Sequence, residues 1–145
     1  MSTINSLNVS ASGMTAQRLR MDIISQNIAN VNTTRDADGN VYKRKVTVFA
    51  EKDGGSFGDV LTRATDAAGN GVKVTAVADD TKSTMRKVYD PSHPDADEDG
   101  YVTYPNVNIV QEMTDMIDAS RSFEANVTAF NAGKSMALKG LEIGK

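Results

Sequence analysis

Three aspartates and a glycine in the segment DADEDG have the spacing of a calcium-binding loop. Asp95, Asp97, Asp99 and Gly100 occupy the first, third, fifth and sixth places, where carboxylates coordinate the ion and glycine permits a sharp turn. The twelfth place is Asn106, although the loop requires a bidentate glutamate there. A calcium-binding module is therefore one hypothesis for this segment. We favour the other, an acidic turn between a strand and a helix.

Residues for catalysis are scarce. His93 is the single imidazole, and it lies between Ser92 and Pro94. There is no Gly-x-Ser-x-Gly segment of the kind that presents a nucleophilic serine. The glycine-rich AAGNGVKV lacks the Lys-Ser/Thr pair of a phosphate-binding loop. The chain has no cysteine, which excludes disulfides and thiolate chemistry. We expect neither enzyme activity nor a cofactor.

Composition also limits the partners. The formal net charge of −3 argues against a nucleic-acid-binding surface, and the basic patch YKRK at 42–45 is too small for one. We expect this patch to be a solvated or subunit-facing edge. No apolar run approaches the roughly 18 residues of a membrane-spanning helix, so direct membrane insertion is not expected. No cleavable signal is visible, which predicts a cytoplasmic protein or export by a route that needs none.

Charged residues divide the chain into three zones. Residues 1–34 contain three charged side chains, residues 35–105 contain 23, and residues 106–145 contain nine. We therefore expect an N-terminal helix in the first zone, a β-rich middle domain with a Pro/Asp-rich turn in the second, and a C-terminal helix in the third.

Apolar residues recur every seven positions in both end zones, which is typical of paired helices. Asn108, followed three positions later by Gln111, resembles a capping box that starts the C-terminal helix after Pro105. The predicted assembly and helix seam comprises Leu7, Met14, Met21, Ile28, Ile109, Met113, Met116, Phe123, Val127, Phe130 and Leu141.

The middle zone has β patterning. Residues 41–51 alternate and are rich in valine, and residues 59–65 and 71–80 flank the hairpin signal Asn70-Gly71. A further strand begins at Met85 and is followed by turns at Pro91 and Pro94. The predicted fold class is α+β, with two long terminal helices pairing as a coiled-coil-like hairpin and a small antiparallel β domain inserted between them.

The N-terminal zone carries small and amide side chains where surface helices usually carry Lys and Glu. Neutral amides can be buried when they are hydrogen-bonded, whereas charges are costly to bury. This pattern fits a face packed against neighbouring subunits. It also fits a weakly structured polar tail, and the residues alone leave both open.

The segment SQNIANVNT at 25–33 resembles the signature near the N-terminus of bacterial flagellar axial proteins of the rod and hook. The matching residues are Ser25, Asn27, Ile28, Ala29, Asn30 and Thr33. Residues 15–33 extend this match upstream, and residues 89–113 and 116–136 look most similar to the proximal rod proteins of that family. The segment NSLNVSASGM at 5–14 departs from the resemblance, because it is more polar than the opening usual in such proteins.

This resemblance implies a structural subunit of the periplasmic rod, the drive shaft that transmits motor torque to the hook. The implied partners are other copies of the chain, other rod proteins and the flagellar type III export apparatus, which requires no cleavable signal peptide. The resemblance also places the terminal helices at the inner tube. We expect Asn27 and Asn30 to make buried amide hydrogen bonds in an interface. The alternative within the resemblance is another rod or hook axial protein.

Overall fold

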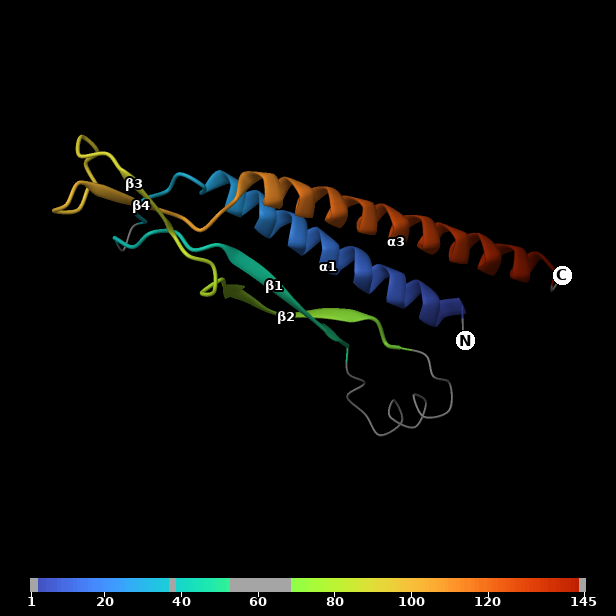
Figure 1. Ribbon diagram of the computed structural model, residues 1–145. Helices are drawn as coiled ribbons and strands as arrows, with labels where there is room; N and C mark the ends of the chain where they lie inside the picture. The colour runs from blue at the N-terminus through green and yellow to red at the C-terminus, as the bar shows by residue number, and fades with distance from the viewer. Residues whose placement is uncertain (1–2, 37–38, 53–68, 144–145) are drawn as a thin grey trace.

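Two long helices run antiparallel and form the length of the molecule. In the computed structural model they are α1 (Thr3–Ala29) and α3 (Ile109–Ile143), which pack against each other (Figure 1). The structure describes residues 3–36, 39–52 and 69–143. Two small antiparallel sheets lie between the helices in the chain order. The predicted α+β fold class is confirmed.

The start of α3 has the predicted local cause. The side-chain Oδ1 of Asn108 accepts hydrogen bonds from the backbone N–H of Val110 (3.0 Å) and of Gln111 (3.4 Å). These bonds satisfy amide groups that have no partner inside the helix. Pro105 is buried just upstream. Asn108 therefore caps the helix, as its position in the sequence predicts.

Small residues allow the two helices to approach closely. A Cβ atom added at Gly13 would lie 2.7 Å from Oδ1 of Asn126, and one added at Gly133 would lie 3.1 Å from Cδ2 of Leu7. Gly13 lowers helix propensity by itself, but here it makes room for the facing helix. The helix pair thus depends on close packing at both glycines.

The first sheet is a two-stranded ribbon that packs on α1. Strand β1 (Lys45–Glu51) pairs with β2 (Val72–Asp79), with Lys45 opposite Asp79 and Glu51 opposite Val72. Both strands contact α1, which lies between this ribbon and α3 (Figure 1). The N–H of Val72 donates to Oγ of Ser12 at 3.0 Å and ties β2 to α1. The strand predicted at 59–65 lies outside the described residues.

The second sheet is a hairpin beyond the end at which α1 stops and α3 starts (Figure 1). Strand β3 (Arg86–Tyr89) pairs with β4 (Tyr101–Tyr104), with Tyr89 opposite Tyr101. The return strand β4 was not predicted, because four residues after a Pro/Asp-rich turn are too few to show alternation. Gly100 has a φ of 79°, a left-handed conformation that favours glycine and lets the chain turn back into β4.

The core of the described chain is small and lies toward the C-terminal half of α1. Its buried apolar residues are Ala16, Ile23, Ile24, Val102 and Ala119. Two polar residues, Asn27 and Glu112, are buried as well. The interior therefore contains a polar cluster that requires its own partners.

Candidate functional site

Asn27 lies at the centre of the polar cluster, in the segment that resembles the family signature. The residue is 1% exposed. The Nδ2 group donates to the carbonyl of Lys45 (2.9 Å) and to Oε2 of Glu112 (3.0 Å). Its Oδ1 accepts from the N–H of Lys45 (2.9 Å) and from the hydroxyl of Tyr42 (3.0 Å). All four hydrogen-bonding positions of the amide are thus used.

This geometry corrects one expectation. Asn27 does make the predicted buried amide hydrogen bonds, but its partners belong to β1, to the segment before it and to α3 of the same chain. The amide pairs with both backbone groups of Lys45 as a neighbouring strand would. Asn27 therefore holds α1 to β1 inside one molecule and is not available to a neighbouring subunit.

The remaining signature residues have different roles. Asn30 is half-buried; its Nδ2 donates to the carbonyl of Gln26 (2.9 Å), and its Oδ1 accepts from the hydroxyl of Thr33 (3.1 Å). These local bonds close the end of α1. Ile28 is half-buried, whereas Ser25 and Ala29 are exposed. Within the signature, Asn27 is buried and joins α1 to β1, and Asn30 bonds within the end of α1. Ser25 and Ala29 face solvent.

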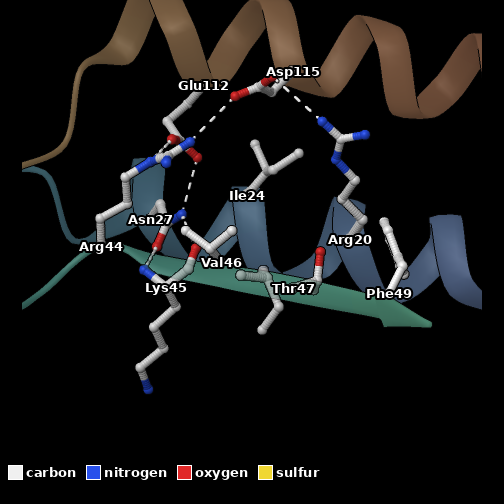
Figure 2. A pocket seen from close by; sticks show the side chains of 11 residues that line it. Arg20, Ile24, Asn27, Arg44, Lys45, Val46, Thr47, Phe49, Glu112 and Asp115 are labelled. Carbon is white, nitrogen blue, oxygen red and sulfur yellow. Dashed lines mark hydrogen bonds and ion pairs between the residues drawn. The ribbon is translucent and has the colours of Figure 1, made fainter. Parts of the chain in front are cut away.

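Glu112 is the most deeply buried charged group in the described chain, with 0% of its surface exposed. Its Oε1 accepts from Nε of Arg44 at 2.5 Å, and its Oε2 accepts from Asn27 (Figure 2). A carboxylate removed from water is tolerated only when it is paired and hydrogen-bonded. Arg44 and Asn27 together meet that requirement.

Arg44 connects three carboxylates. Besides Glu112, its Nη2 lies 3.2 Å from Oδ2 of Asp115, and its Nη1 lies 3.7 Å from Oδ2 of Asp80. Burial opposes the charge of the guanidinium, but the hydrogen bond and charge of Glu112, with Asp115 and Asp80, outweigh it and raise the pKa of Arg44. Arg44 therefore remains charged and is paired within the chain, so the expectation of a solvated or subunit-facing edge at YKRK is wrong for this residue, whereas Lys43 is exposed.

Asp115 extends the network to a second arginine. Its Oδ1 lies 3.4 Å from Nη2 of Arg20, so this carboxylate lies between two guanidinium groups (Figure 2). The network thus joins α1, α3 and the chain at the start of β1. We call Arg20, Asn27, Arg44, Glu112 and Asp115 the junction cluster.

The groups around the cluster hold it in place. Asn106 accepts from the N–H of Arg44 (2.8 Å) and donates to the carbonyl of Asp80 (2.9 Å). Hydrogen bonds from the Ser83 hydroxyl and from backbone N–H groups lower the pKa of Asp80. Burial raises the pKa of the Tyr42 hydroxyl, and the carboxylates of Asp79 and Glu112 raise it further, so the phenol stays protonated and donates to Asn27.

A pocket of about 280 Å³ adjoins the junction cluster and is lined by its five members together with side chains of α1 and β1 (Figure 2). Both acidic residues that line it, Glu112 and Asp115, are bound to guanidinium groups. Among the described residues, no group of three or more His or acidic side chains is placed to hold a metal ion. The hydrogen bonds and ion pairs of this arrangement hold α1, α3 and the start of β1 together.

The acidic turn that resembles a calcium loop is the connection between β3 and β4. Asp95 forms an ion pair with Arg35 at 2.8 Å and accepts from the hydroxyl of Thr34 at 2.8 Å. Oδ1 of Asp97 accepts from the N–H of Tyr101 at 2.7 Å. Nδ1 of His93 accepts from the N–H of Asp95 at 3.1 Å. These bonds shape the turn and tie it to the segment after α1.

The predicted seam residues fall into two groups. Partly buried positions are Leu7, Met14, Met21, Ile28, Met116, Phe123, Val127 and Phe130. Exposed positions are Ile109, Met113 and Leu141, of which Leu141 is 72% exposed. The most buried positions of α3 are instead Glu112, Ala119 and Gly133, spaced by multiples of seven. That the exposed seam residues contact other subunits stays a prediction.

Sequence reasoning missed the junction cluster except for Asn27. Glu112 lies in the first turn of α3, where acidic residues are common because they interact favourably with the helix dipole, so it does not stand out in the sequence. A signal was nevertheless present. Glu112 shares a seven-residue column with Ala119, Asn126 and Gly133, and a charged residue in such a column indicates a buried carboxylate that needs a cation. No comparable signal identifies Arg44 as that cation.

Within the described residues, neither helix combines the length and the apolarity that crossing a membrane requires.

Comparisons with known proteins agree at both ends of the chain. Residues 7–35 match the family model described as flagella basal body rod protein, and residues 98–143 match that of the flagellar basal body rod FlgEFG protein C-terminal. The chain is 49% identical to the flagellar basal-body rod protein FlgC of Bacillus subtilis, with all of both chains covered. It is 46% identical to FlgC of Borreliella burgdorferi, over 99% of this chain and 98% of that one. The identity to FlgC of Salmonella typhimurium is 35%, with both chains fully covered.

Proposed function

This chain belongs to the family of flagellar basal-body rod proteins, and on that basis we propose that it is a subunit of the proximal rod that assembles helically and transmits motor torque to the hook. The family is one of structural proteins of the basal body. The proposal of a proximal rod subunit is supported by the full-length similarity to FlgC proteins and by the pair of long helices.

The observation that carries the proposal is the exposed apolar surface of α3. Large apolar side chains usually lie inside a protein or at an interface when they are grouped. On α3 the exposed ones are Ile109, Val110, Met113, Ile117, Met136, Leu138 and Leu141. Such a surface needs a protein partner, which a multi-subunit rod supplies.

Paired helices suit the mechanical role. At 1.5 Å per residue, the 35 residues of α3 make a helix about 52 Å long. A helix of this length resists bending when a second helix packs along it, as α1 does. Repeated heterologous contacts that do not close on themselves generate a helical assembly, the geometry that a shaft requires.

The partners of this proposal are other copies of the chain and other rod proteins, with the flagellar type III export apparatus during secretion. Export by that route needs no cleavable signal peptide. Assembly would be in the periplasmic part of the basal body. The proposal includes no nucleic acid, no cofactor and no direct membrane insertion.

The test is deletion of the gene, followed by complementation. We expect the deletion strain to grow normally but to lack hook and filament in electron micrographs, and we expect the intact gene to restore both. A deletion strain that still builds hooks, or one that fails to grow, would contradict the proposed role. The control is complementation with a chain truncated before α3, which should not restore motility.

A further inference from the structure

The exposed apolar side chains of α3 form two separate groups. The upstream patch consists of Ile109, Val110, Met113 and Ile117, and the downstream patch consists of Leu138 and Leu141, while Met136 is exposed on the opposite side of the helix. Between them, the exposed positions of α3 other than Met136 carry only small, polar or charged side chains. The two patches therefore lie near opposite ends of one helix and are different surfaces.

The downstream patch lies where α3 extends past its partner helix. Leu7 of α1 packs at the level of Gly133, so the first residue of α1, Thr3, lies about one turn further along α3. Because α3 continues to Ile143, its last turns extend past the start of α1 (Figure 1). Leu138 and Leu141, exposed by 53% and 72%, belong to this extension.

Each patch is flanked by exposed charges of both signs. Asp118 and Arg121 are exposed beside Ile117, and Lys134, Lys139 and Glu142 are exposed around Leu138 and Leu141, so Lys139 and Glu142 repeat the order of Asp118 and Arg121 with opposite signs. No ion pair of these five side chains is found in the part of the chain that the structure describes. Apolar groups with complementary charges at their rims are the usual composition of a specific protein interface.

The spacing within the two patches also matches. Ile117 and Leu138 are 21 positions apart, and so are Asp118 and Lys139. Twenty-one residues are three heptads. In a supercoiled helix, Leu138 therefore lies on the same side as Ile117, and Lys139 lies on the same side as Asp118. A single axial shift of about 32 Å would place Leu138 of one helix beside Ile117 of another, with Lys139 beside Asp118.

We propose that the downstream patch of one subunit docks on the upstream patch of a second copy of this chain, in a parallel arrangement shifted by about three heptads. The contact joins two different surfaces, so it is heterologous and leaves each subunit one free patch for the next. The stem of Lys134 would cover Met113 while its ammonium group stays in water. This inference rests on the proposed role as a rod subunit and specifies the contact.

Disulfide crosslinking tests the contact directly, since the chain contains no cysteine of its own. Ile117→Cys and Leu138→Cys are placed in two differently tagged copies that are co-expressed in the deletion strain. A disulfide forms only when the Cα atoms lie within about 7 Å. We expect a crosslinked dimer that carries both tags after mild oxidation, and none from either variant alone or from Thr128→Cys with Leu138→Cys.

Charge reversal provides a second test. Asp118→Lys and Lys139→Glu should each reduce swimming in soft agar several-fold, and the two changes in one chain should restore most of it, because every contact then regains opposite charges. Glu124→Lys, also exposed on α3, should not rescue Lys139→Glu. Absence of rescue, or a crosslink from the Leu138→Cys variant to a different rod protein in place of the second copy, would overturn the inference. The deletion and complementation experiment tests the rod role separately, so failure of the proposed contact and failure of the rod role give different results.

Discussion

The two ends of the helix pair are built in opposite ways. At the end where α1 stops and α3 starts, the junction cluster satisfies buried polar groups within one chain. At the other end, α3 extends past α1 and exposes Leu138 and Leu141. At the first end the buried polar groups are satisfied within the chain, although Ile109, Val110, Met113 and Ile117 stay exposed beside them, whereas no such cluster of described residues lies beside Leu138 and Leu141 at the other end. The same helix pair thus separates residues that determine the fold from residues that are free to determine assembly.

We expect the largest effect on rod assembly from substitutions in the middle of α3, where α1 packs against it. Phe123 and Phe130 are partly buried in the middle of α3. Replacing either with Asp would place a carboxylate at the helix contact, so we expect loss of rod assembly and of motility, while the protein is still exported. Electron microscopy of basal bodies and immunoblots of exported protein measure the two outcomes. Normal swimming, or an equal defect in the exposed control Thr128→Asp, would contradict the seam assignment.

Next in size is the removal of the buried carboxylate at the junction. Glu112→Ala leaves the guanidinium of Arg44 and the amide of Asn27 without their buried partner, and we expect a loss of about 3 kcal/mol in the free energy of unfolding. Urea unfolding followed by circular dichroism measures this. Glu112→Gln keeps an acceptor and should cost less. The exposed Glu124→Ala should change the unfolding free energy little, and an equal loss there would remove the distinction between the two positions.

A smaller but still severe effect is expected at Asn27. Asn27→Asp would bring a second negative charge within hydrogen-bond distance of Glu112 and remove the donor to the carbonyl of Lys45. We expect a loss of about 2 kcal/mol in the free energy of unfolding. The matched change Asn30→Asp lies at the half-buried helix end, where solvent screens the charge, and should cost less. Equal losses at the two asparagines would show that Asn27 is not the specific clamp.

The smallest expected difference concerns the isolated chain without substitutions: the rate of amide hydrogen exchange should vary along each helix. Amides of α1 near Ile24 and Asn27 are held by the core and the junction cluster, so they should exchange slowly. Amides at the start of α1 and in the last turns of α3 should exchange much faster. Mass spectrometry of peptides measures the difference. Uniform protection along all of α1 would show that the two ends are equally stable without partners.

Several parts of the fold were predictable because their causes are local. The seven-residue spacing on α3 and the cap at Asn108 predicted a long helix that starts after Pro105, and the structure confirms that helix. The valine-rich segment 41–51 predicted β1, although the strand starts only at Lys45. Strand β4 was missed, because its pairing with β3 depends on a turn geometry that four residues do not reveal.

The site was predictable only in part. The signature pointed to Asn27 and to buried amide bonds, which the structure contains, but it gave no indication that the partners lie in the same chain. Arg44 lies in a basic run that looks like an ordinary surface patch. It becomes the partner of Glu112 because the ribbon packs on α1 and brings positions 68 residues apart together.

Local signals in the chain were enough for the two helices, the β-rich insert and the family, because periodicity, caps and signature residues act over a few positions. Which polar residues are satisfied inside the molecule, and which apolar residues stay uncovered, follows only from the folded arrangement. Both depend on the register between α1 and α3, set where Leu7 meets Gly133 and Asn27 meets Glu112. The seven-residue columns indicate which faces of the helices are covered, but they do not specify which position of α1 meets which position of α3.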